Sequence, residues 1–208
     1  MIEGYLTPIG ECENTIVIQR SKFICVISSV QNEEDAKRVI ENIRKKHSLA
    51  NHNCYAYIAD DKGLIQKFSD DGEPQGTAGL PMLEVLKNKK LFKTVAVVTR
   101  YFGGIKLGTG GLTRAYSGSV NDCISKAKIV NMLKSKIYAT DIEYDGYSKL
   151  LKILTNQDTI ILQTDFNNTV SLSFAVKENC ADKLLENINN AFNGKLLIFE
   201  KESGYSAF

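Results

Sequence analysis

The chain has 208 residues, of which 43% are hydrophobic, so it can bury one large core or two ordinary ones, and disorder is excluded for most of its length. No apolar run approaches the roughly 20 residues that a membrane helix needs, and the first residues lack a signal peptide's order, so we expect a cytoplasmic protein without a membrane partner. The net charge of +2 by itself predicts neither a nucleic-acid nor a membrane partner.

The N-terminal part is predicted to begin with a hairpin and a helix. Residues 15–19 and 23–30 are rich in β-branched and aromatic side chains and flank a polar turn, which indicates two paired strands. Asn32 is a suitable N-cap for a helix whose apolar residues recur at helical spacing up to Ile43. Residues 54–59 and 64–68 predict a second hairpin.

An acidic loop then leads into a short helix. This helix is predicted to begin near Thr77, with Thr77 as N-cap and Pro81 in its first turn, and to run to Asn88. Residues 94–100 form a compact apolar strand, followed by a glycine-rich loop and a long amphipathic helix that reaches Ala127. We expect the function to be centred on the segment from Gly72 to Gly118.

From about Lys134 a second series of predicted strands and helices begins. It reads as strand (137–144), helix (146–154), strand (159–164), strand (169–176), helix (180–192) and strand (196–200), which is the βαββαβ order of a ferredoxin-like domain. Only 3 of the 15 glycines follow residue 118, so this part has little loop irregularity. We therefore predict an α+β protein with a functional domain at 1–132 and a docking or recognition domain at 133–208.

Five glycines fall within nine residues between a predicted strand and a predicted helix: Gly103, Gly104, Gly108, Gly110 and Gly111. Such a loop lets backbone N–H groups approach an anion at a helix N-terminus. Arg100, Lys106 and Arg114 can supply the counter-charge. The pattern matches neither the nucleotide-binding P-loop nor the dinucleotide fingerprint. The alternative is that the glycines only provide positive-φ turns for closely packed backbone.

Three carboxylates, Asp70, Asp71 and Glu73, precede the short helix. Such acids can bind Mg²⁺ or act as a general base, whereas the alternative is a capped polar turn in which Asp-Gly is the turn signal. Thr77 closes this loop and joins the candidate anion-binding residues. The spacing of a calcium loop is absent.

Asp71, Glu73 and His52 are the catalytic candidates. His52 stands two residues before Cys54, but neither the zinc-deaminase pattern nor a serine elbow occurs. The five cysteines are isolated and odd in number, so we predict reduced thiols and assign no metal site. The sequence identifies no cofactor.

Basic residues gather around the glycine loop. Residues 1–130 contain 18 Lys and Arg against 14 Asp and Glu, and the excess is concentrated between Lys87 and Lys134, where Asp122 is the one acid. We interpret this stretch as an anion-facing surface. Its ten basic residues are Lys87, Lys89, Lys90, Lys93, Arg100, Lys106, Arg114, Lys126, Lys128 and Lys134.

Two segments carry a family resemblance. HNCYAYIADDKGLIQKFSDDGEPQGTAGLPMLEVL and VAVVTRYFGGIKLGTGGLTRAYSGSV resemble the core of the IMPACT family, and the length and βαββαβ tail are similar to its bacterial YigZ branch. The resemblance implies an N-terminal fold like the second domain of small-subunit ribosomal protein five, with a left-handed βαβ unit, and a C-terminal domain akin to the last domain of elongation factor G. It also implies translational control, which is the role of the eukaryotic members; their partner site is not transferred here.

The positions that match the family pattern are Asp71, Gly72, Glu73, Pro74, Gly76, Thr77, Gly79, Pro81, Arg100, Gly103, Gly104, Lys106, Leu107, Gly110, Gly111, Leu112, Arg114 and Ala115.

Three functions remain open from the sequence. The first is a translation-associated regulator that binds RNA or the ribosome through the basic glycine-loop face. The second is an enzyme acting on a phosphorylated or other anionic small molecule, with Asp71 or Glu73 as base or metal ligand. In that alternative the anion is held by Lys106, Arg100 and Arg114. The third is a protein-interaction module.

Overall fold

The computed structural model describes residues 4–155 and 158–208. The chain divides into two compact units, one spanning Tyr5–Val130 and the other containing Asn131–Phe208 together with Gly4. Helices and two sheets make up the described chain, so the prediction of a mixed α and β protein is confirmed. In the described parts of the chain, no helix is both long enough and apolar enough to span a bilayer.

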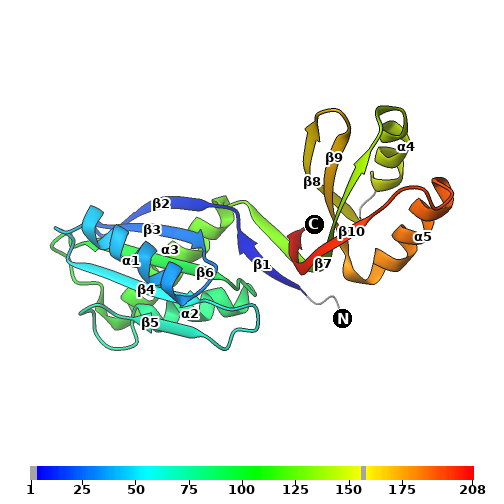
Figure 1. Cartoon of the computed structure of the whole chain (residues 1–208). Coiled ribbons are helices and arrows are strands. Elements are labelled where there is room, and N and C mark those ends of the chain that lie inside the picture. The colour runs from blue at the N-terminus through cyan, green and yellow to red at the C-terminus, as the bar shows by residue number, and fades with distance from the viewer. Residues whose placement is uncertain (1–3, 156–157) are drawn as a thin grey trace. The chain divides into compact units, whose positions relative to one another are not determined.

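The first unit is built on a sheet with the strand order β2-β3-β6-β4-β5 (Figure 1). Every neighbouring pair is antiparallel, so both predicted hairpins are confirmed. In the first hairpin, Gln19 and Arg20 both have positive φ (44° and 66°), a combination that suits the right-handed twist of a two-residue hairpin turn. The strands are β2 (Glu11–Ile18), β3 (Ser21–Ser29), β4 (His52–Ile58), β5 (Gln66–Ser69) and β6 (Thr94–Tyr101).

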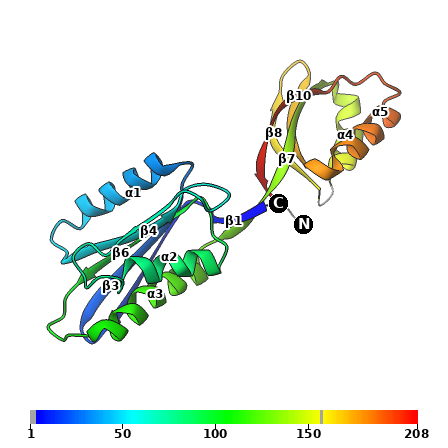
Figure 2. The ribbon, with the colours of Figure 1, turned by 90° about the horizontal axis from the view of Figure 1, so that it is seen from below.

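Helices cover both faces of this sheet (Figure 2). Helix α1 (Glu33–Lys46) buries its apolar stripe on one face, and Asn32 caps it by accepting the N–H of Asp35, as predicted. Helices α2 (Gly79–Asn88) and α3 (Gly108–Lys126) pack on the other face. Because both faces are buried, the central strands β3 and β6 are almost continuously apolar.

Helix α1 is a crossover between two parallel strands. Strands β3 and β4 each pair antiparallel with β6, so they run parallel to one another with β6 between them. A βαβ unit of this kind is what the resemblance to ribosomal protein five implies. Its left-handedness stays a prediction.

The second unit has the predicted βαββαβ order. Strand β7 (Ile129–Ile142) pairs with both β9 and β10, and β9 pairs in turn with β8. The ferredoxin-like name stays a prediction. The other elements are α4 (Tyr144–Leu154), β8 (Thr159–Phe166), β9 (Val170–Lys177), the 3₁₀ turn η1 (Glu178–Cys180), α5 (Ala181–Ala191) and β10 (Phe199–Ala207).

The strands of this sheet differ from the prediction in three places. Strand β7 was expected to begin at residue 137 but begins at Ile129. The last strand was placed at 196–200, but β10 begins at Phe199 and extends to Ala207. Its polar residues form a strand because they pair along β7 from Met132 to Ala139. A further strand, β1 (Gly4–Pro8), was not predicted and also pairs with β7. Strands β1 and β10 depend on a partner far away in the sequence, which local patterns do not reveal.

Truncating a core residue of β3 should destabilise the first unit. Ile27 is fully buried in the layer that α2 and α3 cover. Replacing Ile27 by Ala removes three buried carbons, so we expect the free energy of unfolding to fall by about 2–5 kcal/mol in urea denaturation. The matched control is Val17→Ala on β2, where the side chain is 67% exposed. A loss in the control as large as in Ile27→Ala would contradict this packing.

Candidate functional site

The loop between β5 and α2 contains three carboxylates that the structure uses in three different ways. Asp70 organises the loop and the start of α2. Its carboxylate accepts the backbone N–H groups of Gly76, Ala78 and Gly79 at 2.8, 3.0 and 2.8 Å. The N–H groups of Ala78 and Gly79 lie at the N-terminus of α2, where they would otherwise have no partner. Asp70 therefore replaces a conventional N-cap.

The prediction that Thr77 is the N-cap of α2 was wrong. Ala78 occupies the cap position and makes no side-chain capping bond. The Thr77 hydroxyl instead donates to the carbonyl of Pro74 at 2.6 Å, and the residue is buried. Thr77 thus lies inside the loop rather than on an open surface. Pro81 does lie in the first turn of α2, where its missing N–H costs nothing.

Asp71 ties the loop to α1 and β4. Its carboxylate accepts from the guanidinium of Arg44 at 3.0 Å and from the backbone N–H of Asn53 at 2.6 Å. Its carbonyl lies 2.9 Å from Nδ1 of His52. Because a carbonyl only accepts, Nδ1 carries the proton, which leaves Nε2 of His52 facing Oε1 of Glu73 at 3.9 Å.

Glu73 is the centre of a buried polar cluster. The residue is 8% exposed, and its Oε1 accepts from Nη1 of Arg100 at 2.6 Å and from the Tyr116 hydroxyl at 2.8 Å. Burial raises the pKa of Tyr116 far above its ordinary value, so the hydroxyl keeps its proton and remains a donor. Arg100 is the penultimate residue of β6 and Tyr116 lies in α3, so Glu73 joins the acidic loop to both flanks of the glycine loop.

Arg100 is a buried residue, 5% exposed, with its charge met by Glu73. Its guanidinium carbon lies 5.3 Å from the ring centre of Phe23 and 5.5 Å from that of Phe102, and Nη2 lies 3.4 Å from the Ser21 hydroxyl. Such stacking and pairing compensate a cation that has left water. The anion-facing surface was expected to include Arg100, but the structure places its side chain beneath that surface.

Cys54 is buried in the same interior. Its thiol donates to the carbonyl of Asp70 at 2.9 Å. Burial raises the pKa of Cys54, so the thiolate that nucleophilic chemistry needs is disfavoured. Among the residues with described placement, no group of three or more His, Cys, Asp or Glu side chains is arranged to hold a metal ion.

The glycine loop combines a close approach with an open helix start. A Cβ on Gly103 would lie 2.1 Å from the backbone of Arg20, and the Gly103 N–H donates to the Ser21 hydroxyl at 3.1 Å. Gly104 and Gly108 have positive φ (87° and 68°). The structure thus supports the turn-and-packing interpretation for these three glycines.

The start of α3 is exposed and carries no negative charge. Leu107 occupies the cap position without a side-chain hydrogen bond, and no acid lies in the first turn. Lys106 and Arg114 are exposed, and Arg114 reaches back so that its Nη1 would lie 3.7 Å from a Cβ on Gly110. Two cations and the unpaired backbone N–H groups at the start of α3, which include those of Gly108 and Gly110, therefore lie in one short stretch of the surface.

The sequence did not identify every member of this arrangement. Tyr116 was assigned to the apolar stripe of the long helix, Ser21 to a turn and Phe23 to a strand. For Tyr116 a signal existed, because a tyrosine among buried helix positions needs a partner for its hydroxyl. Arg44, which pairs with Asp71, carried no signal beyond its place in the last turn of α1.

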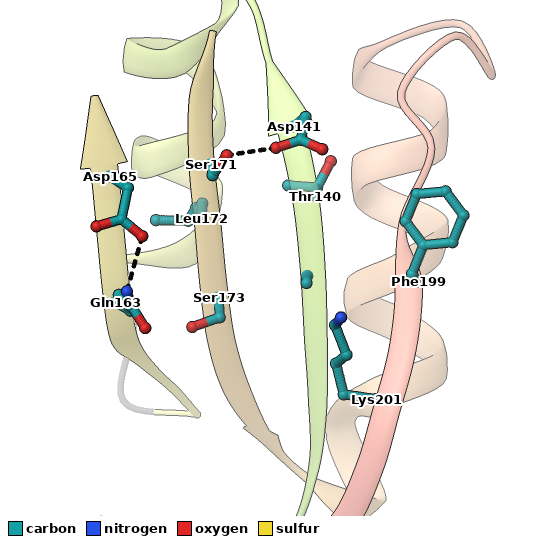
Figure 3. Close-up of a pocket in the computed structure, with 10 residues that line it drawn as sticks. Thr140, Asp141, Gln163, Asp165, Ser171, Leu172, Ser173, Phe199 and Lys201 are labelled. Carbon is teal, nitrogen blue, oxygen red and sulfur yellow. Dashed lines mark hydrogen bonds between the residues drawn. The ribbon is translucent and has the colours of Figure 1, made fainter. Parts of the chain in front are cut away.

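The second unit has a hollow of its own, of about 250 Å³, on the open face of its sheet (Figure 3). It is polar and shallow. Asp141 accepts from the Ser171 hydroxyl on the next strand, and Gln163 donates to Asp165 beyond it. Phe199 and Lys201 of β10 border it. Its acids are already hydrogen-bonded to neighbours, so the exposed cations of the first unit are the stronger candidate site for a ligand.

The comparisons with known proteins agree with this division. The first unit matches the model described as the Impact N-terminal domain over residues 19–124. This is the unit in which a buried ion pair joins an acidic loop to a glycine-rich loop. Residues 140–195 match the model described as a domain of unknown function, DUF1949. The chain therefore has the two-domain composition that these models define.

Individual relatives cover nearly the whole chain. It is 41% identical to the IMPACT family member YvyE of Bacillus subtilis, over 99% of this chain and 94% of that protein. It is 35% identical to the IMPACT family member YigZ of Escherichia coli, over 97% and 96%. A crystal structure titled as that of a hypothetical protein is 32% identical, with a TM-score of 0.63 over 97% and 99% of the two chains. The protein belongs to the IMPACT family, which confirms the resemblance.

The close approach at Gly103 should make it intolerant of substitution. Gly103→Ala forces the backbone of the β2–β3 turn to move, so we expect a loss of more than about 2 kcal/mol in the free energy of unfolding. Gly118→Ala is the control, because a Cβ there meets nothing within 4 Å and alanine favours the interior of α3 by about 1 kcal/mol. Equal effects of the two substitutions on the melting curve would refute the proposed contact.

Proposed function

We propose that this protein is a translation-associated regulator that binds RNA or the ribosome through the basic face of its glycine loop. The observation that carries the proposal is the exposed start of α3, where Lys106 and Arg114 flank a helix N-terminus without acid or cap. Phosphate groups complement such a surface in both charge and hydrogen bonding. The link to translation comes from the family, whose eukaryotic members act in translational control.

In this proposal, residues of the site have distinct tasks. Lys106, Arg114 and the backbone N–H groups of Gly108 and Gly110 contact phosphate, with Gly111 beside them. Arg100 acts indirectly, because its ion pair with Glu73 fixes the end of β6 from which the loop departs. Gly103 and Gly104 shape the loop, and Thr77 supports the adjoining acidic loop from inside.

The internal bonds of the carboxylates favour this proposal over an enzyme acting on an anionic small molecule. A general base needs a free lone pair directed at a substrate. Glu73 accepts from Arg100 and Tyr116 in the interior, and Asp71 accepts from Arg44 and from the N–H of Asn53. Both bonds to Glu73 use Oε1, so Oε2 of Glu73 and Nε2 of His52 are the atoms on which the enzyme alternative depends.

Removing the two exposed cations should weaken RNA binding and its salt dependence. The salt dependence of the affinity for RNA is described by the slope of the logarithm of the association constant against the logarithm of the salt concentration, which is negative. For the double variant Lys106→Ala/Arg114→Ala, we expect this slope to become less steep by about 1.4, because each phosphate contact on a single strand contributes about 0.7. The measurement is fluorescence anisotropy with labelled single-stranded RNA, followed by cosedimentation with ribosomes. Arg100→Ala is avoided because it removes a buried charge partner.

The control variant removes the same charge from the other face of the sheet. Lys37→Ala/Lys45→Ala changes two exposed residues of α1. RNA and ribosome binding should be nearly unchanged in that variant. Equal losses in the two double variants would indicate non-specific charge attraction, and the absence of salt-dependent binding in the unmodified protein would overturn the proposal.

A further inference from the structure

The free edge of the first unit's sheet lies next to a helix, and the two form a groove. Strand β5 is the last strand in the order β2-β3-β6-β4-β5 (Figure 1). Beside it, Leu80, Leu83, Glu84 and Lys87 follow one stripe of α2. Together with Gln66, Lys67 and Phe68 of β5, they line a groove of about 390 Å³. None of these residues belongs to the glycine-loop site.

The outer edge of β5 offers unpaired backbone groups. The N–H of Ala59 donates to the carbonyl of Ile65, directly opposite it, so the pairs bonded to β4 continue at Lys67 and Ser69. The alternate residues, Gln66 and Phe68, therefore direct their N–H and C=O groups away from the sheet. Within residues 4–155 and 158–208, no backbone hydrogen bond of a turn or loop uses those groups.

Apolar side chains are exposed along this edge. Phe68 is opposite Ala56, which lies in the core under α2, so the Phe68 ring is on the α2 side of β5. Phe68 and Leu80 are 40% and 41% exposed, and Leu64 and Ile65 just before the strand are exposed as well. An edge strand that leaves apolar residues in water is a template for another strand.

Lys67 borders the groove as part of β5, but its side chain lies on the opposite side of the strand. Lys67 is opposite Tyr57, which belongs to the core under α1. Glu84 of the groove is already paired with Lys87 at 3.2 Å, whereas Lys67 makes no ion pair in the described portion of the chain. A strand added to β5 would therefore meet apolar surface on one side and a lysine on the other.

We propose that the groove between β5 and α2 binds an extended peptide segment of a partner protein, in which apolar and acidic residues alternate. The segment adds as a strand to β5 through the backbone of Gln66 and Phe68. Its apolar side chains fill the groove beside Phe68 and Leu80, and its carboxylates face Lys67. This inference does not depend on RNA binding by the glycine loop.

The test uses a defined probe, an acetylated and amidated seven-residue peptide of alternating glutamate and valine, titrated into the ¹⁵N-labelled full chain. We expect saturable shifts of the Gln66 and Phe68 amide signals below about 1 mM peptide, together with slower exchange of both amide protons. The same peptide with lysine in place of glutamate should bind about ten-fold more weakly.

Two variants probe the two parts of the interaction. Gln66→Pro removes an N–H that the β4–β5 ladder does not use, and Leu80→Ser removes an apolar wall of the groove. Each should weaken peptide binding about ten-fold or more. If Gln66→Pro perturbs the fold, Leu80→Ser still tests whether the groove binds the peptide. Val17→Ser, on the opposite edge strand β2, is the control and should bind as the unmodified protein does.

Several results would overturn the proposal. One is the absence of shifts at Gln66 and Phe68 at the highest peptide concentration. Another is equal affinity for the glutamate and lysine peptides, and a third is unchanged binding in Leu80→Ser. Shifts of the same amides that depend on protein concentration without peptide would identify a second copy of the chain as the occupant instead.

Discussion

The carboxylate of Glu73, buried between Arg100 and Tyr116, is the interaction on which the arrangement of the first unit's loops depends. An ionised pair removed from water is tolerated only where geometry and further hydrogen bonds compensate the lost hydration. Here the compensation comes from three separate elements, because the acidic loop, the end of β6 and the middle of α3 each contribute one group. Displacing any one of them leaves a buried charge or hydroxyl without its partner.

This constraint explains how the protein can expose the N-terminus of α3 without a side-chain cap. The glycine loop has few side-chain anchors of its own, and its shape follows from where Arg100 and Gly103 hold its first residues. Asp70 and Asp71 bind their own loop to α2, α1 and β4 in the same manner. The carboxylates that resemble catalytic groups in the sequence thus serve mainly to hold the loops in place through internal hydrogen bonds. The exposed cations Lys106 and Arg114 remain available to a ligand.

The sequence predicted what depends on local pattern. Both hairpins, the helices and the Asn32 cap follow from periodicity and capping over a few residues. What it missed depends on distant partners. Asp70 caps α2 from eight and nine residues away, and Glu73 meets Arg100 across 27 residues. An arginine next to a glycine loop looks the same in sequence whether it faces solvent or a buried carboxylate, so the burial of Arg100 could not be predicted.

The most direct test of this account is a double-mutant cycle on the free energy of unfolding, with Glu73→Gln, Arg100→Met and the double variant. Each single change leaves the other partner uncompensated in the interior, so each should cost about 3–5 kcal/mol. The account predicts that the double variant loses at least about 2 kcal/mol less than the sum of the two single losses. Losses that add to within about 0.5 kcal/mol would contradict it, because the two side chains would then not depend on one another.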